Sequence, residues 1–177
     1  MKATGIVRRI DELGRVVIPK EIRRTMRIRE NEPLEIYTER DGEIIFKKYS
    51  PIGGISASSA QCAEAIAKSS GCPVAVCDKD NIIAVSGISK KEFLEKPISL
   101  SLSTLLSRRK LYSFDSNSAA VEMTDNGGRI SCFAPILADG DVIGAVMSLA
   151  QDDKLPTETE QKLVSAGAMF LGKQTEV

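Results

Sequence analysis

Residues 5–28 constrain the fold more than any other part of the chain. They contain two short runs rich in β-branched residues, 6–10 and 15–18, separated by the turn-forming residues 11–14. β-Branched residues favour strands and Gly14 can adopt a positive φ, so the pattern predicts a β-hairpin. Pro19 comes next, and proline lacks the N–H of a strand ladder but suits the first turn of a helix. A short helix is therefore expected directly after the hairpin.

The same stretch is strongly basic. Residues 1–29 hold nine Lys or Arg and three acids, whereas residues 30–50 hold three and six and residues 51–177 hold twelve and fifteen. One face of the expected helix carries four cations: Lys20, Arg23, Arg24 and Arg27. Neighbouring cations without an acid among them repel one another, which is unfavourable for a helix face that only contacts water. The pattern therefore favours binding of a polyanion. The formal net charge of zero hides this local excess.

Two further alternating runs, 33–39 and 43–49, flank Asp41 and Gly42 and predict a second hairpin. The order over residues 1–50 is then β-β-α-β-β. A unit of about 50 residues with few apolar side chains rarely buries enough surface to be stable alone. We expect it to dimerise through intertwined hairpins.

Residues 5–28, followed by P-L-E-I-Y and E-I-I-F-K-K-Y, resemble the AbrB-type swapped-hairpin DNA-binding domain of bacterial transition-state regulators. The resemblance implies that Arg8, Arg15, Arg23 and Arg24 contact double-stranded DNA. It places Arg9 and Lys20 on the same surface. A dimer would dock with strands and loops as well as helix ends, and the single helix argues against a helix-turn-helix.

The loop-forming residues 50–54 indicate a domain boundary, which gives a DNA-binding domain over 1–50, a linker over 51–54 and a second domain over 55–177. In the second domain we expect helices over 56–70, 90–95 and 99–108 and a last helix capped by Thr157 and Glu160. Strands are expected over 72–77, 82–86, 130–137 and 142–149, whereas 111–129 has no clear pattern. Ser58 and Gln61 are placed to cap the first helix. The fold class is α+β, with an antiparallel sheet flanked by helices.

P-I-L-A-D-G-D-V-I-G-A-V, residues 135–146, resembles the penultimate hairpin of GAF domains, which are small sensory modules. The likeness implies either a small-molecule effector between the sheet and residues 97–130 or a filled core that serves oligomerisation. Small residues on the terminal helices suggest a homotetramer formed across them: Ala63, Ala67, Ala166 and Gly167. An AbrB-type domain joined to a GAF-like one, together with S-G-I-S-K-K-E-F-L at 86–94, is similar to two-domain sporulation regulators of late forespore gene expression.

The composition excludes several classes of catalytic site. The chain has no histidine, which removes Ser-His-Asp and Cys-His nucleophiles and every histidine-containing metal site. Its four cysteines, Cys62, Cys72, Cys77 and Cys132, have separations of 10, 5 and 55 residues and lack the paired spacing of zinc sites. We expect reduced structural thiols, no metal, no cofactor and no catalysis.

Two other functions remain open at this stage. Some GAF domains are cysteine-dependent methionine-sulfoxide reductases, and some swapped-hairpin domains are antitoxins that mask a toxin with a disordered arm. Charges at Arg8, Arg9, Asp11 and Glu12 precede any apolar run, so no signal peptide is expected, and no apolar stretch is long enough to span a membrane. The expected location is the cytoplasm, on the nucleoid, and the forespore if the sporulation resemblance holds.

Overall fold

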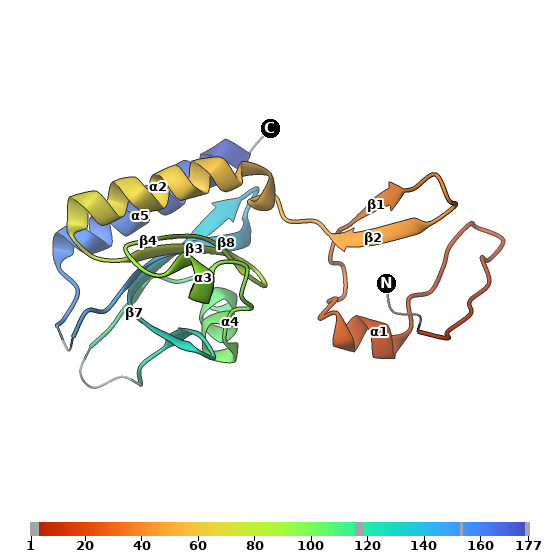
Figure 1. The fold of residues 1–177 in the computed structure, drawn as a ribbon, viewed down its shortest axis with the longest axis horizontal. Coiled ribbons are helices and arrows are strands. Elements are labelled where there is room, and N and C mark those ends of the chain that lie inside the picture. The colour runs from red at the N-terminus through yellow and green to blue at the C-terminus, as the bar shows by residue number, and fades with distance from the viewer. Residues whose placement is uncertain (1–3, 116–118, 153, 176–177) are drawn as a thin grey trace. The chain divides into compact units, whose positions relative to one another are not determined.

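The computed structural model describes residues 4–115, 119–152 and 154–175 and divides into two compact units, Met1–Tyr49 and Ser50–Val177 (Figure 1). Among those described residues, no helix is both long and apolar enough to cross a bilayer.

The N-terminal unit, residues 1–49, contains one short helix and one hairpin. The helix α1 spans Lys20–Thr25, and the strands β1 (Leu34–Thr38) and β2 (Ile44–Lys48) pair antiparallel, with Leu34 opposite Lys48 and Thr38 opposite Ile44. Gly42, with φ +81°, occupies the left-handed region in the turn between the strands. The predicted second hairpin is confirmed.

The first predicted hairpin forms its turn but not its ladder. The Asp11 N–H donates to the Arg15 carbonyl at 3.0 Å, and the Gly14 N–H donates to the Asp11 carbonyl at 3.0 Å. Residues 6–10 and 15–18 are not strands in the single chain. Val7 is 90% exposed and Val17 is 68% exposed, so these β-rich runs lack a partner surface within one copy.

The N-terminal unit has almost no core of its own. Of its described residues, 4–49, only Pro19 is buried. Its large apolar side chains lie at the surface: Ile6, Val7, Ile10, Leu13, Val16, Val17, Met26, Ile36, Tyr37, Ile44, Phe46 and Tyr49. Two paired strands alone are marginally stable in water, so this unit lacks the apolar burial that a folded domain requires.

The C-terminal unit, residues 50–177, is built on an antiparallel sheet. Its main strands run in the order β4-β3-β8-β7-β5, and β6 pairs with β7. Their bounds are β3 Val74–Asp78, β4 Ile82–Ser86, β5 Tyr112–Ser113, β6 Glu122–Thr124, β7 Gly127–Ala138 and β8 Asp141–Leu149. The α+β class with an antiparallel sheet is confirmed. The short strands β5 and β6 lie in the stretch that had no clear sequence pattern.

Helices cover both faces of this sheet, with α2 and α5 side by side on one face (Figure 1). The helices are α2 Ser56–Ser70, α3 Lys90–Phe93, α4 Leu100–Ser107 and α5 Glu158–Thr175. Strand residues alternate between two cores: Val74 and Val76 pack with α2 and α5, whereas Ala75 and Cys77 pack with α4. Because helices cover both faces of the sheet, the strands bury apolar side chains on both faces.

Two details differ from the sequence predictions. The capping box at Ser58 and Gln61 is wrong, because a 3₁₀ turn at Gly53–Ile55 leads into α2 at Ser56 and places both residues inside the helix. Residues 51–54 were predicted to be a linker. They include Ile52, which is fully buried in the core with side chains of α2, α5 and the sheet. Burial of this large apolar side chain ties the start of the C-terminal unit to its core.

The small residues expected to join subunits are used partly within the chain. Ala63 is fully buried, and a Cβ on Gly167 would meet Ile66 Cδ1 at 2.5 Å and Cys62 Sγ at 3.0 Å. These two residues let α2 and α5 approach each other inside one copy. The assignment of Ala63 and Gly167 to an interface between copies is therefore wrong.

Candidate nucleic-acid interface

Three local structures carry the six predicted DNA-binding residues. Arg8 and Arg9 lie in the extended segment before the first turn, and Arg15 lies at the end of that turn. Lys20, Arg23 and Arg24 belong to α1. All six are exposed. No hydrogen bond or ion pair among the described residues ties the side chains of Arg8 or Arg9 to the other four.

The turn at residues 11–15 is organised by one carboxylate. Asp11 Oδ1 accepts from the N–H groups of Leu13 at 3.0 Å and Arg15 at 2.8 Å, and Asp11 Oδ2 accepts from Arg15 Nε at 2.8 Å. The backbone N–H of Arg15, followed by its guanidinium, holds the pKa of Asp11 below its usual value. Asp11 therefore accepts hydrogen bonds from both the backbone and the side chain of Arg15.

The helix α1 presents its cations outward from an anchored start. Pro19 precedes its first residue as a buried N-cap, and the Arg23 N–H donates to the Pro19 carbonyl at 2.9 Å. Lys20, Arg23 and Arg24 are one helical turn apart and share a face. Arg27, expected on the same face, instead lies beyond the helix end with φ +53°.

Few of the six predicted DNA-binding cations are paired with an acid among the residues that the structure describes. Within the described residues, Arg8, Arg9, Lys20, Arg23 and Arg24 form no ion pair, and only Arg15 of the six is paired, with Asp11. Exposed cations that outnumber the nearby acids and are mostly unpaired create a field that favours a polyanion such as duplex DNA. The role of Asp11 in holding Arg15 was missed from the sequence, although an Asp four residues before an Arg, with a glycine between them, was the available signal.

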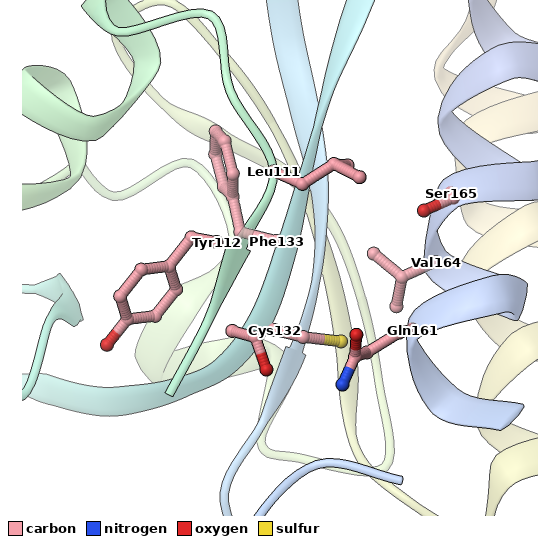
Figure 2. Close-up of a pocket in the computed structure, with 8 residues that line it drawn as sticks. Leu111, Tyr112, Cys132, Phe133, Gln161, Val164 and Ser165 are labelled. Carbon is pink, nitrogen blue, oxygen red and sulfur yellow. The ribbon is translucent and has the colours of Figure 1, made fainter. Parts of the chain in front are cut away.

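Among the described residues, buried side chains fill part of the region between the sheet and residues 97–130, where an effector pocket was expected. Leu102, Leu105, Met123, Phe133 and Met147 pack into one buried cluster there. A separate cavity of about 80 Å³ lies between β7 and α5, where Cys132, Val164 and Ser165 line it (Figure 2). Binding sites for small molecules usually measure a few hundred Å³, so this cavity is too small for an effector.

A larger groove of about 490 Å³ opens between the end of β7 and α5. Its lining is mainly apolar and includes the exposed side chains of Leu111, Leu137 and Met169, with Arg109 and Lys173 beside them. Arg109 is paired with Asp141 at 2.7 Å. The groove is a surface feature rather than an enclosed pocket.

The cysteines lack the features of catalytic thiols. All four are free; Cys77 and Cys132 are buried, and Cys62 and Cys72 are partly buried. Burial raises the pKa of every one of them, and raises that of Cys132 to about 11. Reactive cysteines have lowered pKa values. Within the described residues, no group of three or more Cys, Asp or Glu side chains is placed to hold a metal ion.

Comparison with known proteins identifies the class of protein to which these two units belong. Residues 54–176 match the family described as stage V sporulation protein T C-terminal, transcription factor, and residues 7–53 match the family described as antidote-toxin recognition MazE, bacterial antitoxin. Transition state regulatory protein AbrB of Bacillus subtilis (strain 168) is 65% identical over 51 residues, which cover 29% of this chain and 52% of that protein. The two units thus define a DNA-binding transcription regulator.

The whole chain identifies the family within that class. Stage V sporulation protein T of Bacillus subtilis (strain 168) is 49% identical over 179 residues, which cover 99% of both chains. The chain therefore belongs to the stage V sporulation protein T family of transcription factors. The GAF-domain structure of a phosphoenolpyruvate-protein phosphotransferase from Coxiella burnetii has a TM-score of 0.55 at 12% identity, covering 67% of this chain and 80% of that one, which confirms the GAF-like fold.

Proposed function

We propose that this sporulation transcription factor binds duplex DNA selectively, as an oligomer, through the exposed cations of its N-terminal unit: Arg8, Arg9, Arg15, Lys20, Arg23 and Arg24. The observation that supports this is their exposure together with the absence of ion pairs at five of them within the described residues. AbrB, which shares this segment, is called a transition state regulatory protein. In this proposal the protein acts in the cytoplasm, on the nucleoid, and regulates late forespore gene expression.

The oligomer follows from the exposed apolar surface. In the N-terminal unit, the runs at 6–10 and 15–18 and the hairpin β1-β2 expose their β-branched and aromatic side chains. Pairing with the same runs of a second copy would complete a β-barrel and bury them, which is the swapped-hairpin homodimer. Such a dimer doubles the number of cations that face one duplex. The groove beside α5 in the C-terminal unit supports a homotetramer formed from two such dimers.

No catalytic role is proposed. The raised pKa values of the four thiols and the absence of histidine disfavour a cysteine-dependent reductase. The match of residues 7–53 to an antitoxin family keeps toxin binding as the second candidate. Residues 50–177, however, form a folded unit and not a disordered arm, and this favours regulation of transcription.

The test is binding of the full-length protein to duplex DNA over a range of salt concentrations. Arg23→Ala and Arg24→Ala should each weaken binding on the order of tenfold and make the log-log salt slope shallower by about one per lost phosphate contact. Arg108→Ala removes the same charge from an exposed position in the C-terminal unit and should leave affinity unchanged. Equal affinities for Arg23→Ala, Arg24→Ala and the wild type would contradict the assignment.

A further inference from the structure

In the turn at residues 11–15, Asp11 bonds both the turn backbone and the Arg15 guanidinium. Asp11 anchors the backbone of the turn through the N–H groups of Leu13 and Arg15, and its second oxygen takes the Nε–H of Arg15 at 2.8 Å. The main-chain bonds Asp11 N–H to Arg15 O and Gly14 N–H to Asp11 O, both 3.0 Å, close the same turn. One carboxylate therefore links the turn backbone to the guanidinium.

This arrangement leaves the outer edge of Arg15 available. A guanidinium has five N–H donors, and Asp11 uses the one on Nε. The four N–H groups on the two terminal nitrogens remain, and the Arg15 side chain is 70% exposed. Two parallel donors in a fixed plane match the paired acceptors of a guanine edge, O6 and N7. A side chain that is held before binding also loses less freedom on binding.

The negative charge of Asp11 favours a role in DNA sequence selectivity and not in overall DNA affinity. A carboxylate beside a DNA-binding cation repels phosphate and lowers affinity for any duplex. Phosphate contacts tolerate many geometries, whereas base contacts require one. A carboxylate at this position is unfavourable for general DNA binding and useful for base recognition.

We propose that Asp11 is a positioning residue that aims the terminal nitrogens of Arg15 at a base edge in the DNA, so that Arg15 contributes to sequence selectivity. This inference rests on the proposed DNA-binding function. It assigns to Arg15 direct base recognition and to Asp11 the control of its geometry.

The experiment compares Asp11→Asn with Glu12→Gln in the full-length protein. Both variants remove one negative charge at adjacent exposed positions. The Asn side chain retains an oxygen that can accept from Leu13 and Arg15, so the turn persists, but its amide nitrogen cannot accept from Arg15 Nε. Dissociation constants are measured for two probes: a duplex selected by the wild type from a random library, and a scrambled duplex of equal length and composition.

Asp11→Asn should lower the ratio of selected to scrambled affinity by about tenfold, whereas Glu12→Gln should leave that ratio unchanged. Both should bind the scrambled duplex somewhat more tightly, because each removes a charge that repels phosphate. In an Arg15→Lys background, which lacks the fork of nitrogens, Asp11→Asn should have no further effect on the ratio. Matching circular dichroism spectra check that the variants are folded.

An Asp11→Asn protein with the wild-type ratio overturns the positioning role and leaves the proposed function standing. The same holds for an Asp11→Asn effect that persists in full with Arg15→Lys. A wild-type protein that selects no sequence overturns the proposed function itself, so the two failures are distinct.

Discussion

At the scale of single residues, a buried polar chain fixes the start of α5 on the sheet. Ser148 Oγ donates to Glu160 Oε1 at 2.5 Å, and the Cys132 N–H donates to Ser148 Oγ at 3.2 Å. The predicted capping box is confirmed: the Glu160 N–H donates to Thr157 Oγ1 at 3.1 Å, and the Thr157 N–H donates to Glu160 Oε2 at 3.3 Å. Glu160 thus caps its helix and joins that helix to β8, and these hydrogen bonds are why its polar side chain can be buried there.

Cys132 makes stability depend on pH at this junction. Burial raises its thiol pKa from 9.0 to about 11. A neutral buried thiol stabilises the folded state below the unfolded pKa, and this contribution is lost as the pH rises through the folded pKa. From pH 8 to pH 10, the free energy of urea unfolding should fall by about 1 kcal/mol more in the wild type than in Cys132→Ser. Parallel pH profiles for the two proteins would contradict the assignment.

At the scale of elements, two glycines of α5 allow close packing. A Cβ on Gly172 would overlap the backbone carbonyl oxygen of Leu137 in β7, whereas a Cβ on Gly167 would meet the end of the Ile66 side chain in α2. A side-chain end can move aside, but a strand carbonyl cannot without disturbing the sheet. These contacts set how near α5 lies to each neighbour.

Gly172→Ala should therefore destabilise the protein by about 2 kcal/mol, despite the higher helix propensity of alanine. Gly167→Ala should cost less, about 1 kcal/mol or below, because Ile66 can adjust. Urea unfolding of both variants, followed by circular dichroism, measures the difference. An order reversed between the two glycines would refute this account of the packing.

At the scale of the whole molecule, exposed apolar side chains on both units indicate association. Met169, 73% exposed, lies in the groove beside α5 with Leu111 and Leu137. If this groove joins two dimers, a carboxylate at position 169 should separate them, because it would have to leave water and enter an apolar interface. The swapped hairpins of the N-terminal units should still hold each dimer together.

Met169→Glu should convert a tetramer to a dimer in light scattering after gel filtration, with DNA binding retained but weaker, since linked binding units gain effective concentration. Gln174→Glu adds the same charge to an exposed position of α5 outside the groove and should remain tetrameric. A monomeric Met169→Glu protein would contradict dimerisation through the N-terminal units. A tetrameric one would contradict the role of the groove.

Local sequence patterns determined much of this protein. Alternation and β-branching predicted β1, β2, β3, β4, β7 and β8, and the Thr157 and Glu160 pair predicted the start of α5. These features depend on neighbours in the sequence, through side-chain periodicity and capping. The basic surface could also be predicted from the sequence, because Lys and Arg on a short helix remain exposed in almost any fold.

Tertiary structure decided what local patterns could not. The runs 6–10 and 15–18 have the composition of strands but form none in a single copy, because a strand requires a hydrogen-bonded partner strand and neither run has one there. The burial of Ile52, the use of Gly167 within the chain and the buried cluster beside α4 all depend on contacts between segments distant in sequence. Sequence set the secondary structure and the charge of the surface, whereas packing decided which apolar side chains were buried and which stayed exposed.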